Sequence, residues 1–176
     1  MALLLSDPLM ANSFIMIFML FWYRAPGLVS LISLTLYIAI SFAIFKLMPV
    51  TLTLSGIGGF ILSLGIAVDA NVLIFERLKE ELRLGKTYNQ ALEEAFKRAW
   101  TSIRDGNATT LISCFVLYWF SSSIIKGFAL TLGVGIIISL FTSIVVTRNL
   151  MRLLSGWGIP EKFGWLFLKP RSSEKK

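Results

Sequence analysis

Histidine is absent from this sequence, and cysteine occurs once, as Cys114. Without imidazole, any proton transfer must use carboxylates, lysine, tyrosine or water. A single cysteine excludes an internal disulfide and a cysteine-based metal cluster. The sequence also lacks a phosphate-binding P-loop, so an ATP-driven pump is not indicated. We therefore expect no cofactor, no metal site and no enzymatic activity.

Charge is also scarce. Charged residues make up 15% of the chain and hydrophobic residues 56%, with a mean hydropathy of +0.76. Soluble domains carry about a quarter charged residues. A helix of roughly 20 apolar residues crosses a bilayer core of about 30 Å. The sequence therefore predicts an all-α membrane protein, a polytopic bundle of five transmembrane helices. The expected spans are residues 9–23, 27–48, 54–75, 108–123 and 127–147.

The basic residues are distributed unevenly between the expected spans. Of the 17 Lys and Arg residues, Lys46 and Lys126 fall on one side, and the other side holds Arg24, seven residues within 76–105 and seven from Arg148 onward. Lys and Arg concentrate in cytoplasmic loops. This predicts an outer N-terminus and a cytoplasmic C-terminus. An outer N-terminus with an odd number of spans leads us to expect a further helix and an outer domain upstream.

The net charge of +7 fits this topology and contact with anionic lipid. Because the charges flank the spans, no nucleic-acid partner is expected. We divide the chain into a transmembrane bundle, residues 1–150, and a basic interfacial tail on the cytoplasmic side, residues 151–176.

The segment 76–105 is polar but patterned. Gly85 is expected to end a charged helix that continues the third span. Thr87 and Gln90 have the spacing of a capping box. Glu93 and Glu94 precede Lys97 and Arg98 by four residues, a spacing that favours ion pairs on one helix. The segment's apolar residues recur at helical spacing: Tyr88, Ala91, Leu92, Ala95, Phe96, Ala99, Trp100 and Ile103. Two interpretations remain open: an amphipathic helix on the cytoplasmic membrane surface, or a linker helix that packs on the floor of the bundle.

Asp69 lies within the apolar stretch LGIAVDANVLIF. A charged Asp near the centre of a membrane helix costs about 2.5 to 3.5 kcal/mol. Such residues often mark proton relays. Asp69 is therefore a candidate proton relay. A structural hydrogen bond to Thr109, Thr110 or Asn107 is the bland alternative, and binding of a cation or substrate is a third.

Other polar residues lie near this acid in the sequence. Asn71 is two positions further on, about 200° around the helix, so it needs a different partner. Arg104 and Asp105 adjoin the start of the fourth span, either as an interfacial anchor or as charge partners for the path to Asp69.

Small residues follow one face of the third span and one face of the fifth. They allow close contact between membrane helices. The glycines assigned to helix packing are Gly56, Gly59, Gly65, Gly127, Gly133 and Gly135.

Three long stretches are similar to the SecD/SecF family of protein-export membrane components. They are GIGGFILSLGIAVDANVLIFERLKEEL (56–82), SIRDGNATTLI (102–112) and KGFALTLGVGIIISLFTSIVVTR (126–148). The resemblance covers residues 14–150, and AVDANVLIFER points to the SecD branch. Gly106 departs from the alanine usual in the family.

The resemblance implies a fold of the resistance–nodulation–division type, with these five spans as helices 2–6 of a six-helix bundle. It implies a multi-pass protein of the bacterial or archaeal cytoplasmic membrane. It also implies use of the proton-motive force through Asp69 for protein export, with Arg104, Asp105, Asn107, Thr109 and Thr110 as polar neighbours. The implied partners are SecF, the SecYEG translocon, a translocating preprotein and membrane lipids.

Two other functions remain open. One is a proton-driven exporter of small molecules or lipids from the same superfamily. The other is a non-transporting membrane scaffold, in which Asp69 is structural.

Overall fold

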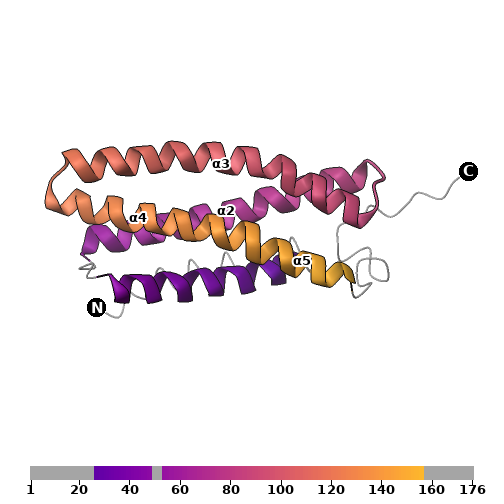
Figure 1. Cartoon of the computed structure of the whole chain (residues 1–176), viewed down its shortest axis with the longest axis horizontal. Coiled ribbons are helices and arrows are strands. Elements are labelled where there is room, and N and C mark those ends of the chain that lie inside the picture. Colours follow the sequence, from indigo (N-terminus) through magenta and orange to yellow (C-terminus); the bar gives the residue numbers. More distant parts are fainter. Residues whose placement is uncertain (1–25, 49–52, 157–176) are drawn as a thin grey trace, which may run out of the picture.

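A computed structural model of the chain describes residues 26–48 and 53–156. Their regular structure is helical throughout, as predicted. A first helix, Pro26–Leu47, is followed by α2 (Leu54–Arg83), α3 (Tyr88–Phe120), α4 (Ser123–Phe141), the π-helical segment η1 (Thr142–Val146) and α5 (Thr147–Gly156). Figure 1 shows these helices lying side by side along one long axis. The predicted span 9–23 and the tail beyond residue 156 lie outside the described residues.

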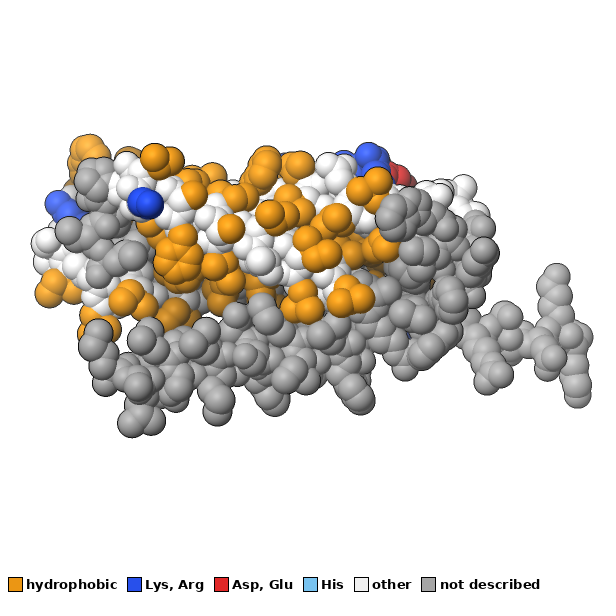
Figure 2. Space-filling model, turned by 90° about the horizontal axis from the view of Figure 1, so that it is seen from below, with side chains coloured by type: hydrophobic (Ala, Val, Ile, Leu, Met, Phe, Trp, Pro, Cys, Tyr) orange, Lys and Arg blue, Asp and Glu red, His pale blue; other side chains and the backbone are white. Residues whose placement is uncertain are grey.

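Three of the described helices are long and apolar enough to cross a membrane. They are Pro26–Leu47, Leu54–Arg83 and the composite rod Ser123–Gly156. On the face shown in Figure 2, apolar side chains cover the middle of the described surface, and the charged groups lie towards its ends. A belt of exposed apolar side chains between charged ends suits a helix bundle surrounded by lipid.

α2 begins and ends where its sequence predicts. The Thr53 side chain accepts a hydrogen bond from the Gly56 backbone N–H at 3.2 Å and so caps the first turn. Beyond Arg83, Gly85 adopts a φ of +82°, which glycine reaches at little cost. The third predicted span therefore continues as one helix through the charged residues up to Arg83.

α3 joins the polar half of segment 76–105 and the fourth span in one helix of 33 residues, and its first half packs against the bundle, as the second interpretation expects. The predicted capping box of Thr87 and Gln90 starts it, and the Thr87 N–H donates to Gln90 Oε1 at 3.4 Å. The apolar stripe of its first half, including Ala95 and Ala99, is buried in a core shared with Ile74 and Leu78 of α2 and Met151 of α5. A surface-lying helix would turn this stripe to lipid, so that interpretation is wrong.

The ion pairs expected within this half of α3 are also replaced. Arg98 bonds to Glu81 of α2 at 2.6 Å, and Glu93 pairs with Arg148 and Arg152 of α5. The charges that the sequence pairs along one helix therefore connect neighbouring helices instead.

The rod from α4 to α5 is continuous but changes its winding at Thr142–Val146. Such π segments are rare and often lie at functional sites. This one lies beside the first helix, because the Ser33 hydroxyl donates to the Thr142 carbonyl at 3.2 Å.

Candidate functional site

Asp69 lies on the face of α2 that is turned towards α3, in an open cleft of about 260 Å³. The side chain is exposed. The α3 wall of the cleft includes Ser102, Gly106, Asn107 and Thr110. The acid is thus surrounded by small and uncharged polar groups.

Among the residues that the structure describes, Asp69 has no ion-pair or hydrogen-bond partner. The structural hydrogen bond from Asp69 to Asn107, Thr109 or Thr110 is therefore not formed in this structure. Thr110 instead donates back to the Gly106 carbonyl at 3.2 Å, and Thr109 donates to the Asp105 carbonyl at 3.0 Å. Both hydroxyls donate to backbone carbonyls of α3, and the Asp69 carboxylate has no hydrogen-bond donor or cation bound to it among the described residues.

The expected neighbours of Asp69 are only partly brought together. Asn107 is buried against the cleft and Thr110 lines it. Arg104 and Asp105 bond to each other at 2.9 Å in an exposed position and are not among the cleft residues. In this conformation they are placed as an interfacial pair and not as charge partners of Asp69.

Asn71 faces the opposite side of α2, as the helical period predicts. It is 1% exposed, and its Oδ1 accepts a hydrogen bond from the Thr147 hydroxyl at 3.0 Å. The same Thr147 oxygen lies 3.0 Å from the Ser33 hydroxyl and 3.4 Å from the Thr142 carbonyl. Three helical segments and the π segment therefore meet at one buried polar network.

Sequence reasoning missed the contribution of the first helix to this network. Ser30, Ser33, Tyr37 and Ser41 are all buried. Their spacing of three, four and four residues places them on one helix face. That stripe was the available signal, and it passed unnoticed because the surrounding run is so apolar.

The packing glycines fall into two groups. A Cβ at Gly59 would lie 2.6 Å from the Phe128 carbonyl oxygen, and one at Gly135 would lie 2.5 Å from Ser63 Cβ. A Cβ at Gly56 would lie 3.4 Å from Thr131 Cγ2, and one at Gly127 would lie 3.0 Å from Thr53 Oγ1. These four positions let α2 and α4 approach closely.

The other glycines have more room. A Cβ at Gly133 would make an ordinary contact of 3.6 Å with Cys114, and one at Gly65 would meet nothing within 4 Å. Gly65 was expected to pack, but it faces a side of α2 that no described helix covers. Gly58 and Gly106 are equally open.

A second group of charges joins α3 to α5 at the basic end of the bundle. Glu93 Oε1 accepts hydrogen bonds from Arg152 at 2.6 and 2.9 Å, and Oε2 pairs with Arg148. The hydrogen bonds from Arg152, and then those from Arg148, hold the pKa of Glu93 below its ordinary value. The carboxylate is therefore kept ionised, unlike an acid that must exchange a proton.

Within the described part of the chain, no three Asp, Glu, Cys or His side chains cluster in a way that could hold a metal ion.

Comparison with known proteins gives concordant results. The model of the MMPL family matches residues 8–175. The chain is 58% identical over 142 residues to the protein translocase subunit SecD of Thermobaculum terrenum, covering 78% of this chain and 28% of the relative. It is 45% identical over 153 residues to SecDF of Bacillus subtilis, covering 86% of this chain and 21% of that protein.

A crystal structure of SecDF, a translocon-associated membrane protein from Thermus thermophilus, superposes with a TM-score of 0.84 at 36% identity. The match covers 88% of this chain and 22% of that one. The chain thus spans about a fifth to a third of the length of such relatives. The helix arrangement agrees with the resemblance noted in the sequence, and the chain belongs to the MMPL family, within its SecD/SecF branch.

Proposed function

We propose that this chain is the membrane part of a Sec protein-export component and that Asp69 carries protons across it to drive export. The observation that supports this most is the position of Asp69: a carboxylate in the middle of a helix long enough to cross a membrane, without a counter-charge in the described residues. Acids of this kind inside membrane helices commonly serve ion or proton pathways.

The absence of a fixed partner matters for the chemistry. An acid paired with arginine, such as Glu93, is stabilised in the charged form and releases its proton permanently. Asp69 has uncharged neighbours, among them Asn107 and Thr110, so neither protonation state is held by an ion pair. The acid takes a proton from one side and releases it to the other.

The cleft offers a way to turn this exchange into movement. Gly106 lines the cleft on the α3 side, and a Cβ there would meet nothing within 4 Å. Because an anion in low dielectric attracts hydrogen-bond donors strongly, ionised Asp69 draws the Asn107 amide and the Thr110 hydroxyl towards it. The protonated form releases them, and α3 shifts relative to α2.

The open face of α2 supports a partner. Gly58 and Gly65 lie on its uncovered side, next to exposed apolar side chains such as Ile61 and Leu62, and the cleft that holds Asp69 borders this side. A close-packing helix surface without a described neighbour suits a second helical bundle. We assign this role to a SecF-type bundle, since the Bacillus subtilis relative is named SecDF. The SecYEG translocon and a translocating preprotein complete the assembly, as the name protein translocase subunit suggests.

The proposed topology has five spans with a cytoplasmic C-terminus in the bacterial or archaeal cytoplasmic membrane. α3 contributes the fourth span through its second half, where Phe115, Trp119 and Phe120 are exposed. The described basic residues, apart from Lys46, Lys126 and Arg104, lie towards the end where α2 finishes, α3 starts and α5 runs, and that end becomes cytoplasmic. The first half of α3 is then a cytoplasmic extension of the bundle.

The test replaces Asp69 by Asn in the full-length protein. Proton-driven translocation into membrane vesicles should fall at least about tenfold, the effect of losing one essential proton carrier. Asp105→Asn is the matched control, because it removes an exposed acid of α3 that already pairs with Arg104. The proposal is abandoned if Asp69→Asn supports export at the normal rate and normal protein level.

Thermal stability separates a relay from a scaffold. A relay variant keeps its stability and loses export. A structural Asp69 would lose stability on the same change, and that result would favour a non-transporting scaffold.

A further inference from the structure

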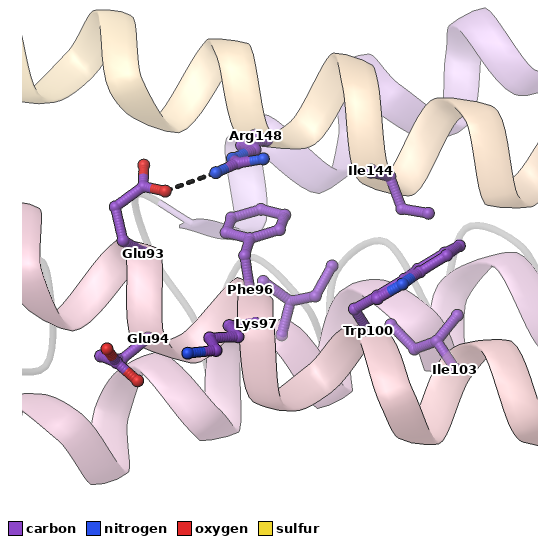
Figure 3. Close-up of a pocket in the computed structure, with 9 residues that line it drawn as sticks. Glu93, Glu94, Phe96, Lys97, Trp100, Ile103, Ile144 and Arg148 are labelled. Atoms are coloured by element: carbon purple, nitrogen blue, oxygen red, sulfur yellow. Dashed lines mark hydrogen bonds and ion pairs between the residues drawn. The ribbon is translucent and has the colours of Figure 1, made fainter.

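A second cavity of about 420 Å³ lies between α3 and the rod formed by α4, η1 and α5. Figure 3 shows its lining, with Glu93 and Arg148 above and Trp100 and Ile103 at one end. It is separate from the Asp69 cleft, although Ile103 contributes to both. Nothing in the proton-relay proposal uses it.

The cavity has an apolar floor. Ile74 and Phe96 are buried, and Ile144 of the π segment faces Trp100 across the opening (Figure 3). Trp100 itself is 39% exposed, although its neighbours in the helical stripe, Phe96, Ala99 and Ile103, are buried. A half-exposed Trp with an apolar floor beneath it is typical of the membrane–water interface.

The charged side chains that line the cavity are Glu93, Glu94, Lys97 and Arg148, and Arg152 lies beside them as a second partner of Glu93. Two arginines, Arg148 and Arg152, face the single carboxylate of Glu93. Lys97 and Glu94 add one charge of each sign, and neither forms an ion pair within the described residues. The lining itself is balanced, and with the adjacent Arg152 one positive charge remains uncompensated at the edge of the cavity.

Arg148 is only partly satisfied. Arg148 bonds to Glu93 through one terminal nitrogen, and its Cζ lies 5.8 Å from the centroid of the Phe96 ring. The Arg148 Nε is buried and has no hydrogen-bond partner. A guanidinium carries five N–H donors. Phosphate oxygens are the acceptors that such an incompletely used fork binds well.

We propose that this cavity binds an anionic phospholipid, with its phosphate at Lys97 and Arg148 and the start of an acyl chain along Ile144 and Trp100. Basic pockets between membrane helices are suited to anionic lipid headgroups. The apolar floor selects a lipid over free phosphate, because inorganic phosphate would leave it uncovered.

The experiment uses the full-length protein with Trp100 as its only tryptophan, the others being replaced by Phe. The protein is reconstituted into phosphatidylcholine vesicles that contain a small fraction of phosphatidylglycerol. Quenching of Trp100 by phosphatidylglycerol with brominated acyl chains is compared with quenching by phosphatidylcholine brominated in the same way. We expect phosphatidylglycerol to be enriched about fivefold at Trp100, the effect of one basic charge near an anionic surface.

Two variants test the assignment in opposite directions. Lys97→Gln should abolish the enrichment, and Glu94→Gln should increase it about fivefold again. An increase in binding is not a result that misfolding can produce. Arg83→Gln is the matched control, because it removes one exposed positive charge near the same end of the bundle and should leave the enrichment unchanged.

Equal quenching by the two lipids would overturn the proposal, and so would an equal response of Lys97→Gln and Arg83→Gln. Complete loss of the enrichment on addition of millimolar inorganic phosphate would also overturn it, since the site would then bind phosphate alone.

Discussion

Asp69 and Asn71 lie two residues apart on α2, but their surroundings are opposite. Asn71 is 1% exposed and bonds to Thr147 within a network that also contains Ser33. Asp69 is exposed in an open cleft beside glycines whose neighbouring space is empty. One face of α2 is covered by the first helix and by α5, and the other borders open space among the described residues.

The comparison shows how a single helix can separate structure from function. Polar groups on the closed face satisfy one another, so their loss is a loss of stability. The polar group on the open face, Asp69, makes no hydrogen bond or ion pair with the described residues, so its loss should cost little stability. Stability and function should therefore respond to different substitutions on the same helix.

The largest expected loss of stability comes from placing a larger side chain in the close contact between α2 and α4. Gly135→Val would place a side chain 2.5 Å from Ser63 Cβ. It should destabilise the bundle by about 3 kcal/mol, because overpacking forces the helix backbones apart. Thermal unfolding in detergent, followed by circular dichroism, measures the change.

Gly65→Val is the matched control on the open face, where a Cβ meets nothing within 4 Å. Its free energy of unfolding should stay within about 0.5 kcal/mol of wild type. If both glycine variants unfold alike, the distinction between the closed and open faces is lost.

A smaller effect is expected at the polar residues themselves. Asn71→Ala removes the acceptor of the buried Thr147 hydroxyl and should cost about 2 kcal/mol of unfolding free energy. Asp69→Ala should change the stability by less than about 0.5 kcal/mol. Chemical denaturation of the two variants side by side gives the comparison, and a larger loss for Asp69→Ala would reverse it.

The smallest expected effect concerns the acid that is permanently paired. Hydrogen bonds from Arg152 and Arg148 lower the pKa of Glu93 below its ordinary 4.5. Its contribution is therefore complete above about pH 5 and is lost as the pH falls below 4.5 through the lower pKa of the folded state. Because the group is partly exposed, the contribution should stay under about 1 kcal/mol.

Unfolding of wild type and Glu93→Gln, measured from pH 3 to pH 7, tests this expectation. The two curves should be separated by a constant amount above about pH 5 and should converge below it. Glu94→Gln, which loses no ion pair within the described residues, should run parallel to wild type. Curves that diverge on acidification would contradict the assignment.

Much of the described fold was predictable from local signals. Hydrophobic run length indicated the helices at 27–48 and 54–75, and the chemistry of Thr87, Gln90 and Gly85 indicated where α2 ends and α3 begins. The helical period also predicted that Asn71 would face away from Asp69. These features depend on neighbours within one or two turns, which the sequence shows directly.

Contacts between distant helices were less predictable. The partner of Asn71 is 76 residues away, and the partners of Glu93 are 55 and 59 residues away. Spacing along one helix favoured Lys97 and Arg98 as partners for the acids of α3, but tertiary packing brought other cations closer. The open space around Gly65 could not be predicted either, because a stripe of small residues does not show which part of it contacts another helix.

The π segment at Thr142–Val146 also sets the direction of everything that follows it. Each residue of an α-helix advances the rotation by about 100°, and a π turn accommodates one residue more than an α turn. If the same residues wound as a regular α-helix, Thr147 and Arg148 would be rotated by about 100° away from Asn71 and Glu93. Deleting one residue here, for example Val145, should instead remove the π turn and leave the inner hydroxyl and the outer guanidinium in phase with their partners.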